Sequence, residues 1–508
     1  MTSAVDSCEY VVVGGGTAGC VIASRLSQGD GTRVLLVEAG GEQQVAAISV
    51  PAAWPGLVQS PLSWGDFTVQ QAATGTTVML PRGRGLGGSS AINAMNFIRG
   101  HHTSYDAWTS AGAKGWGFDD LLPYFKRSEN VVGGDPDLRG LDGPLTVAPA
   151  NPGNPVVAAL LDAAEQTGYR RATDISGGLE EGFGWSDLNV VGGIRQDAFA
   201  AYLSPVIERT NLDVVTNALV HRLRIEHGRC TGIDYSVAGE LVSVACTGEV
   251  VLTAGTIGSA QLLMLSGIGP AGQLRRVGVD VQLDLPGVGE NMHDHPIANV
   301  VYRAARPVPA ARFNHGEAIG LLRSGPWVTA PDLQFVFLDA PGHIPSADAP
   351  EQGYTIGVSA ITPRSRGTVR LAGAEPGRAP LIDPNYVADD HDMATMVAGL
   401  RLAREIGRAP ALDPWRDAEV VPCLDDDEGL RSYVRQTLAS YSHPVGTCRI
   451  GVDATSVVDL ELRVHGIEGL RVADGSVIPA IPSANTNATV YAIAERAADL
   501  ILHSSHSH

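Results

Sequence analysis

The segment from Glu9 to Gly40 constrains the fold more than any other part of the sequence. It reads as a strand, a glycine turn, an amphipathic helix and a second strand, EYVVVGGGTAGCVIASRLSQGDGTRVLLVEAG. Gly14, Gly16 and Gly19 have the spacing that lets backbone N–H groups and a helix N-terminus approach a pyrophosphate. Glu38 ends the second strand, where a carboxylate accepts hydrogen bonds from ribose hydroxyls. The alternative is a tight glycine turn with a surface glutamate, but this order of elements favours a Rossmann-like dinucleotide-binding unit.

Strand-like segments elsewhere indicate two domains that are interleaved along the chain. With 508 residues, the chain is longer than one ordinary hydrophobic core requires. We predict an α/β fold class, in which residues 1–150, 206–296 and 440–508 form the discontinuous cofactor-binding domain. Residues 151–205 and 297–439 are predicted to form a substrate-binding domain of α+β type, built on an antiparallel sheet.

Charge and composition exclude several classes of partner. The chain carries 36 basic and 55 acidic residues, a formal net charge of −19, which disfavours DNA, RNA or anionic membrane surfaces as partners. No segment reaches the ~18 uninterrupted apolar residues of a membrane-spanning helix, and the N-terminal MTSAVDSCEY lacks a basic region before an apolar stretch. The six cysteines lack the spacing of a zinc site or a disulfide framework. We expect a cytoplasmic protein with free thiols, no metal, and no nucleic-acid or membrane partner.

A second glycine-rich segment, Gly83 to Asp106, reads GRGLGGSSAINAMNFIRGHHTSYD and has no strand before it, so it is not another βαβ turn. It resembles the first signature of the glucose-methanol-choline (GMC) oxidoreductase family. The segment from Gly255 to Gly269, GTIGSAQLLMLSGIG, resembles the second signature, although Ala260 stands where the family usually has proline or serine. Three C-terminal blocks, HPVGTCRIG, VADGSVIP and PSANTNAT, are also similar. The resemblance therefore extends over nearly the whole chain.

This resemblance implies that the chain binds FAD. It places Asn93 near the reactive edge of the isoalloxazine ring, Trp64 and Val220 beside the adenine, and Asp474 beside the pyrophosphate and the ribityl chain. Some family members tether FAD through a histidine at the place that aligns with Ile92, and isoleucine cannot form that bond, so we predict noncovalent FAD. The residues predicted to bind the cofactor are Gly14, Gly16, Thr17, Ala18, Gly19, Glu38, Ala39, Trp64, Arg84, Gly87, Asn93, Ala94, Met95, Asn96, Val220, Ala254, Gly255, Asp474, Gly475, Asn485 and Thr486.

Oxidation of an alcohol removes a hydroxyl proton and a carbon-bound hydride, so the site needs a neutral base and a second polar group that fixes the oxygen. His443 heads the block that resembles the family's catalytic block, and we assign it as the base. Asn485 matches the position where the family has asparagine or histidine, and we expect it to hydrogen-bond the substrate oxygen. The alternatives are a buried histidine satisfied by backbone groups and an asparagine that caps the following helix.

The sequence therefore predicts FAD-dependent oxidation of a primary alcohol, aromatic or heteroaromatic, to an aldehyde. Hydride would pass to flavin N5, and O₂ or another acceptor would reoxidise the flavin. Ser442 stands where many relatives carry a bulky aromatic residue, which predicts a wider pocket beside the base. We find no committed site for the cation of choline, and we interpret the triplet from His293 to His295 as structural packing at the lobe boundary and not as a metal site.

Other activities of the same fold stay open at this stage. A hydroxynitrile lyase would keep the flavin and the histidine without net redox chemistry, and a light-driven decarboxylase or a flavin-binding protein without enzymatic activity are further readings. The substrate's identity, the electron acceptor and the oligomeric state are not determined by these motifs.

Overall fold

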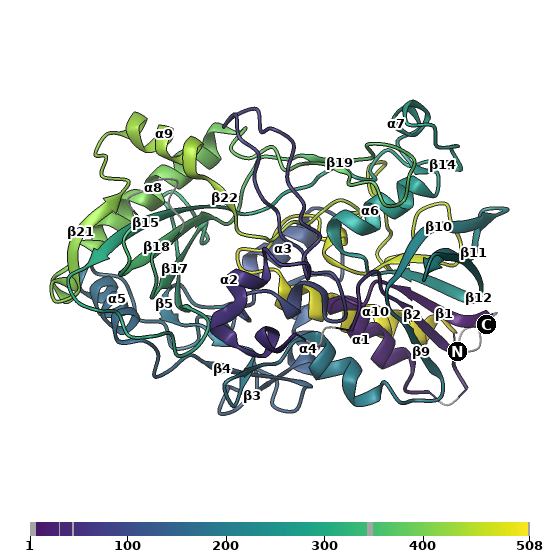
Figure 1. Ribbon diagram of the computed structural model, residues 1–508, viewed down its shortest axis with the longest axis horizontal. Coiled ribbons are helices and arrows are strands. Elements are labelled where there is room, and N and C mark those ends of the chain that lie inside the picture. Colours follow the sequence, from purple (N-terminus) through teal and green to yellow (C-terminus); the bar gives the residue numbers. More distant parts are fainter. Residues whose placement is uncertain (1–6, 30, 43–44, 343–348, 506–508) are drawn as a thin grey trace.

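Two sheet-centred lobes lie side by side along the long axis of the molecule (Figure 1). The computed structural model describes residues 7–29, 31–42, 45–342 and 349–505. The first six residues, part of the N-terminal segment used to predict localisation, lie outside these ranges.

The first lobe contains a seven-stranded sheet in which β10, β11, β12, β1, β2 and β9 are neighbours in that order and β23 pairs with β12. β1 pairs in parallel with β12 and β2, β2 with β9, and β12 with β23, whereas β10 and β11 are antiparallel. Apolar runs such as VLLV in β2 are buried along their whole length, as expected for a parallel sheet covered on both faces. The strands are β1 (Ser7–Val13), β2 (Val34–Val37), β9 (Leu212–Val215), β10 (Ala218–Glu226), β11 (Arg229–Val237), β12 (Glu240–Leu252) and β23 (Leu470–Val472).

This arrangement confirms the predicted Rossmann-like fold. Helix α1 (Thr17–Leu26) follows the glycine turn and packs on β1 and β2. Helix α10 (Asn487–Ser505) packs on α1 and on α4 (Phe118–Ser128), so the C-terminal part of the chain completes the lobe that the N-terminal part begins.

The second lobe contains an antiparallel sheet in which β21, β15, β18, β17, β16 and β5 are neighbours in that order and β22 pairs with β15. Helix α8 (Asp390–Gly407) covers this sheet, with Met393, Met396, Val397 and Leu400 buried at helical spacing. The strands are β5 (Gly182–Trp185), β15 (Pro296–Ala304), β16 (Gly316–Leu322), β17 (Leu333–Leu338), β18 (Gly353–Ala360), β21 (Arg416–Val421) and β22 (Ala439–Ser440).

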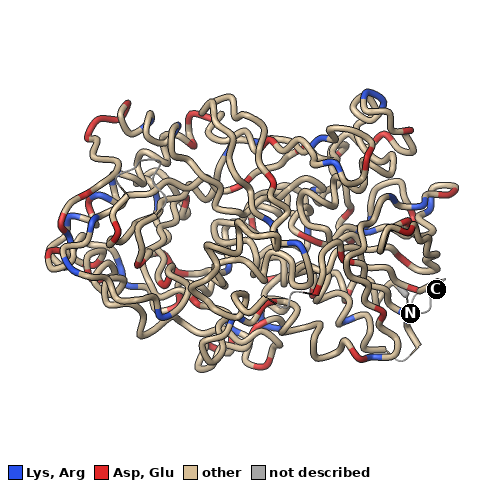
Figure 2. Tube along the Cα trace, in the orientation of Figure 1, with Lys and Arg blue, Asp and Glu red and all other residues tan. Residues whose placement is uncertain are grey.

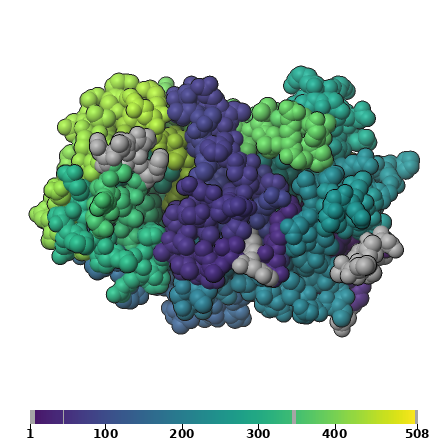
Figure 3. Space-filling model, in the orientation of Figure 1, coloured from purple at the N-terminus to yellow at the C-terminus, as the bar shows by residue number. Residues whose placement is uncertain are grey.

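Shorter elements connect the lobes and surround them. A mostly irregular segment after β2, which contains α2 (Trp54–Leu57), lies across the middle of the face seen in Figure 3, between the two lobes. The hairpin of β19 (Thr368–Arg370) and β20 (Leu381–Asp383) belongs to neither large sheet, and β19 lies against α6 (Gly255–Leu265) of the first lobe. The exact domain boundaries stay a prediction. Apart from short 3₁₀ and π turns, the remaining elements are α3 (His102–Ser110), α5 (Pro155–Gln166), α7 (Ala271–Arg276), α9 (Asp427–Thr437), β3 (Glu129–Val131), β4 (Leu145–Pro149), β6 (Asp187–Leu188), β7 (Val190–Val191), β8 (Ile194–Arg195), β13 (Ile268–Gly269) and β14 (Leu283–Asp284).

Acidic and basic residues are interspersed over both lobes (Figure 2). Within the described ranges, no helix combines the length and the hydrophobicity needed to cross a bilayer. All six cysteines are free, and five of them are buried.

Candidate active site

A cavity of about 910 Å³ brings most of the predicted site residues together. This volume lies within the usual range of small-molecule sites, ~300–1,000 Å³. Gly19, Arg84 and Gly87 do not line the cavity. The predicted residues that do line it are Gly14, Gly16, Thr17, Ala18, Glu38, Ala39, Trp64, Asn93, Ala94, Met95, Asn96, Val220, Ala254, Gly255, His443, Asp474, Gly475, Asn485 and Thr486.

The two glycine-rich segments are in contact, and each needs glycine for its own geometric reason. A Cβ on Gly19 would lie 1.8 Å from the Gly14 carbonyl oxygen, so this glycine allows α1 to pack against the turn. Gly88 has φ +52°, and a Cβ there would lie 2.7 Å from Gly16 Cα. The Gly87 N–H donates to the Gly15 carbonyl oxygen at 2.8 Å. The segments thus form one backbone surface without Cβ atoms at the start of α1, which fits a bound pyrophosphate.

Glu38 is held beside this surface by three backbone donors. Its Oε2 accepts the Gly15 N–H at 2.7 Å, and its Oε1 accepts those of Gly40 at 2.8 Å and Gly85 at 2.9 Å. A carboxylate has about four acceptor positions, so one remains for a hydroxyl donor. This geometry fits the predicted contact with a ribose.

The carboxylate of Asp474 is fully engaged by the protein. One oxygen accepts the Gly255 N–H at 2.8 Å and the Ser259 hydroxyl at 2.6 Å, and the other accepts the Ser476 N–H and hydroxyl at 2.8 and 2.6 Å. Four protein donors therefore occupy the carboxylate. Asp474 fixes the first turn of α6, and any contact with a cofactor falls to its backbone.

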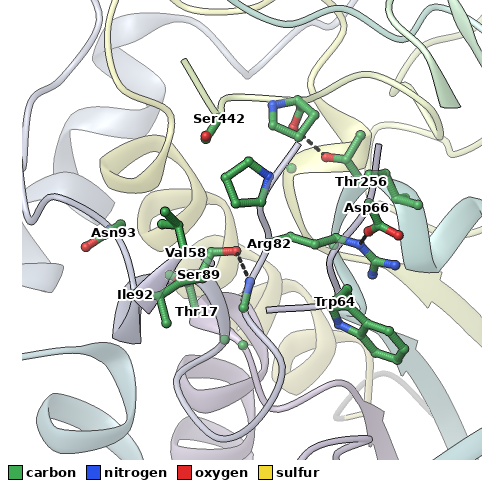
Figure 4. A pocket seen from close by; sticks show the side chains of 18 of the residues that line it. Thr17, Val58, Trp64, Asp66, Arg82, Ser89, Ile92, Asn93, Thr256 and Ser442 are labelled. Carbon is green, nitrogen blue, oxygen red and sulfur yellow. Dashed lines mark hydrogen bonds and ion pairs between the residues drawn. The ribbon is translucent and has the colours of Figure 1, made fainter. Parts of the chain in front are cut away.

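The two ends of the cavity differ in character (Figure 4). At one end, the Arg82 guanidinium lies 4.6 Å from the Trp64 ring centroid, and the guanidinium of Arg84, which does not line the cavity, lies 5.0 Å from that centroid. Ile92 and Asn93 lie at the other end. Trp64, predicted to lie beside the adenine, and Asn93, predicted to lie beside the isoalloxazine, are thus at opposite ends of the cavity.

Arg195 holds Asn93 in place, and sequence reasoning missed it. Its Nη1 donates to the Asn93 carbonyl at 2.7 Å and to the Asn93 side-chain oxygen at 2.9 Å, while Nε donates to the Ile48 carbonyl at 2.9 Å. Burial lowers the pKa of Arg195 to about 10. No motif surrounds this arginine in the sequence, so nothing there signals its role.

His443 and Asn485 meet at the cavity, with Nε2 and Nδ2 3.1 Å apart. The His443 N–H donates to Asp294 Oδ1 at 2.6 Å, and its ring Nδ1 lies 2.9 Å from His295 Nδ1. Burial and the neighbouring His295 hold the pKa of His443 well below its usual 6.5, so the imidazole is neutral. Side chains therefore satisfy this ring, in contrast to the alternative of a histidine bound by backbone groups.

Asn485 is not the cap of the C-terminal helix. Helix α10 begins at Asn487, so the residue before it is Thr486. The Asn485 Oδ1 accepts a hydrogen bond from Gln334 Nε2 of β17 at 3.1 Å, and its Nδ2 faces His443. This geometry leaves a carboxamide and an imidazole directed at the same part of the cavity.

The structure gives the three residues of the segment His293–His295 different partners. The His293 Nδ1 lies 2.6 Å from the Asn291 carbonyl, and its Nε2 accepts the Ile481 N–H at 2.8 Å. Asp294 and His295 instead contact His443, a role that no sequence pattern indicated. Among the residues that the structure describes, no group of three or more metal-ligating side chains is placed to hold a metal ion.

An aromatic side chain does lie beside the base, although Ser442 is not aromatic. The Tyr441 ring centroid lies 4.5 Å from that of His443, at an interplanar angle of 46°. Ser442 lines the cavity with φ +65°. Tyr441 also lines the cavity, and a wider pocket beside the base stays a hypothesis.

Comparisons with known proteins identify the family of this chain. The family described as GMC oxidoreductase matches at residues 8–297 through its N-terminal domain and at residues 363–494 through its C-terminal domain. Oxygen-dependent choline dehydrogenase of Vibrio vulnificus (strain YJ016) is 37% identical, over 97% of this chain and 94% of that protein. Mitochondrial choline dehydrogenase of Homo sapiens is 38% identical, over 98% and 90%.

A solved structure, pyridoxine 4-oxidase from Mesorbium loti, superposes with a TM-score of 0.94 at 34% identity, covering 99% of this chain and all of the other. The chain therefore belongs to the GMC oxidoreductase family and is an FAD-dependent oxidoreductase that acts on CH–OH groups.

Proposed function

We propose that this enzyme oxidises the hydroxymethyl group of an uncharged aromatic or heteroaromatic alcohol to an aldehyde, with His443 as the base. The observation that carries the proposal is the meeting of His443 Nε2 and Asn485 Nδ2 at the cavity, 3.1 Å apart. A neutral imidazole next to an amide donor is the pair that alcohol activation needs.

The protein's own residues divide the chemistry between them. His443 Nε2 accepts the hydroxyl proton, and an N–H of Asn485 donates to the substrate oxygen, which fixes the carbinol before the base. Asp294 fixes the base by accepting its backbone N–H. Bound FAD supplies the hydride acceptor, which O₂ or another oxidant then regenerates.

The glycine-lined backbone surface at the start of α1 and the neighbouring Glu38 form a cradle that fits FAD. Glu38 would bind the adenosine ribose, the first N–H groups of α1 after Gly16 would bind the pyrophosphate, and Asn93 with the backbone that follows it would lie along the isoalloxazine. Ile92 lines the same end of the cavity and offers no nucleophile, so we propose that FAD is held without a covalent bond.

The charges around the cavity argue against choline, although similar relatives are choline dehydrogenases. Among the described lining residues, the carboxylates are Glu38, Asp66 and Asp474, and each is already bound by protein donors. None of them belongs to the antiparallel sheet. That sheet contributes apolar side chains, including Ile297 and Val336.

A histidine paired with a carboxylate adds to this argument. His315 lines the cavity, its Nδ1 lies 2.7 Å from Asp339 Oδ1, and its Nε2 lies 3.2 Å from the Ala52 carbonyl. Both ring nitrogens face acceptors, so the imidazolium satisfies both, and the hydrogen bond to Asp339 raises the pKa of His315. The Asp339 carboxylate is thus taken up by His315 and does not itself line the cavity, so it offers no free negative charge to a quaternary ammonium group.

An alcohol panel followed by flavin absorbance without oxygen tests the proposal. Benzylic and pyridyl-methanol substrates should bleach the flavin faster than choline or small aliphatic alcohols, and His443→Ala should slow bleaching by ~10²–10⁴-fold because the base is lost. His465→Ala, a histidine outside the cavity, serves as the control. Preference for choline would refute the substrate class, and cyanide release from a cyanohydrin without bleaching would indicate a lyase.

A further inference from the structure

A continuous chain of hydrogen bonds passes through the candidate base. It runs from the Ile361 carbonyl to His295 Nε2 at 3.0 Å, from His295 Nδ1 to His443 Nδ1 at 2.9 Å, and from His443 Nε2 to Asn485 Nδ2 at 3.1 Å. The last link joins Asn485 Oδ1 to Gln334 Nε2 at 3.1 Å. His443 therefore has a fixed partner on each ring nitrogen.

Both ends of this chain are attached to neighbouring strands of the antiparallel sheet. Ile361 directly follows β18, and Gln334 belongs to β17, where it pairs with Ser359 of β18. The Ile361 N–H donates to the Asp332 carbonyl at 2.9 Å, which ties the end of β18 to the start of β17. The sheet therefore holds the two terminal groups at a set separation.

The Ile361 carbonyl permits only one direction of hydrogen-bond donation along this hydrogen-bond chain. A backbone carbonyl accepts and cannot donate, so His295 must carry its proton on Nε2. Burial lowers the pKa of His295 to about 3, so near neutral pH this ring has a single proton and a lone pair on Nδ1. His443 must then donate from its own Nδ1, because two lone pairs 2.9 Å apart would repel.

The Asn485 end of the hydrogen-bond chain is consistent with this direction of donation. The His443 ring is neutral, so a proton on Nδ1 leaves a lone pair on Nε2, which accepts from the Asn485 amide. The Asn485 oxygen is then free to accept from Gln334. The reverse direction would satisfy Gln334 and Asn485 equally well but would set a histidine lone pair against the Ile361 carbonyl.

We propose that His295 is a positioning residue that, together with the Ile361 carbonyl, holds His443 in the tautomer with its proton on Nδ1 and its lone pair on Nε2, where the substrate hydroxyl replaces the Asn485 amide as the partner of that lone pair when the alcohol binds. This role rests on the proposed function of His443 as the base. When His443 takes up the substrate proton, its Nδ1–H becomes a charged donor to His295, and that hydrogen bond strengthens. The neutral His295 thus stabilises the imidazolium that forms during the reaction.

Two substitutions at His295 separate this role from simple packing. His295→Leu removes the acceptor, so the rate of flavin reduction at saturating alcohol should fall on the order of 10²-fold with little change in KM. His295→Gln offers an amide oxygen to His443 and an amide N–H to Ile361, and it should restore the rate to within about tenfold of the parent. The matched control is His293→Gln, which alters a buried histidine of the same triplet that makes no contact with His443 and should keep the parental ratio of kcat to KM.

A measurement that needs no substrate keeps the two proposals distinguishable. In protein labelled with ¹⁵N-histidine, the signal that disappears in His443→Ala identifies the base, and its nitrogen shifts and proton couplings report which nitrogen carries the proton. We expect Nδ1–H in the parent and in His295→Gln, and a mixture of tautomers in His295→Leu. A proton on Nε2 in the parent, or a folded, FAD-loaded His295→Leu that reduces flavin at the parental rate, would overturn the role of His295. Failure of every alcohol to bleach the flavin would instead overturn the proposed function and leave the tautomer measurement standing.

Discussion

His443 is neutral because of where it is buried and not because of its residue type. The groups that face its ring or backbone are His295, Asp294, Tyr441 and Asn485. Burial is the largest influence, and it lowers the pKa because a charged ring would lose its hydration. The base is therefore ready to accept a proton at neutral pH without first losing one.

This neutrality predicts the pH dependence of the reaction. The base works only when deprotonated, and its pKa is lowered, so kcat/KM should stay constant from neutral pH to below about 6.5 and fall only at lower pH. A benzylic alcohol without titratable groups keeps substrate ionisation out of the profile. An acidic limb centred above pH 7 would show that His443 is charged in the resting enzyme.

At this scale, motifs predicted the residues that they contain and missed the partners of those residues. His443 and Asn485 lie in C-terminal blocks with distinctive neighbours, so their assignment could be made from the sequence. Gln334 comes from a strand 151 residues before Asn485, and the Ile361 carbonyl acts through its backbone, which no residue pattern encodes. Only the folded sheet brings these groups to the base.

At the scale of elements, the contact between the two glycine-rich segments makes the cofactor cradle. Gly88→Ala would place a Cβ 2.7 Å from Gly16 Cα at a φ of +52°, so the segments would have to separate. We expect FAD affinity to fall by at least about tenfold, which corresponds to ~1.4 kcal/mol, and the melting temperature of the cofactor-free protein to fall as well.

Gly272→Ala is the matched control for this change. Gly272 lies in α7, and a Cβ there would approach nothing closer than 3.9 Å, so alanine should be neutral or stabilise the helix by ~0.5–1 kcal/mol. FAD titration and thermal melting measure both variants. Parental FAD affinity in Gly88→Ala would contradict the argument that this contact builds the cradle.

Regular elements were predictable where periodicity was strong. The βαβ unit around α1, the helix α8 and the strands β17 and β18 all follow from apolar spacing. Periodicity did not reveal that β19 pairs with β20 apart from both large sheets, because a strand of three residues carries too little pattern to indicate its partner. Pairing over long sequence separations is decided by packing, which a local pattern does not contain.

At the scale of the whole molecule, the cavity is lined by residues from both lobes, so a ligand that fills it joins them. FAD binds the folded chain and not the unfolded one, so free FAD at 100 times its dissociation constant should stabilise the fold by ~2.7 kcal/mol. The melting temperature should therefore rise with added FAD. A melting temperature independent of FAD would contradict this coupling.

Acid precipitation of the parent enzyme tests whether FAD is bound covalently. Without a nucleophile at Ile92, acid precipitation should release the flavin, leave the supernatant yellow and the pellet colourless, and allow FAD to be added back. Yellow colour retained in the pellet would show a covalent bond.

The hydrogen-bond chain through His443 has both of its ends in the second sheet, whereas the dinucleotide turn belongs to the first. The backbone surface for the dinucleotide and the oriented proton acceptor are thus supplied by different sheets, and the two meet only where both lobes line the shared cavity.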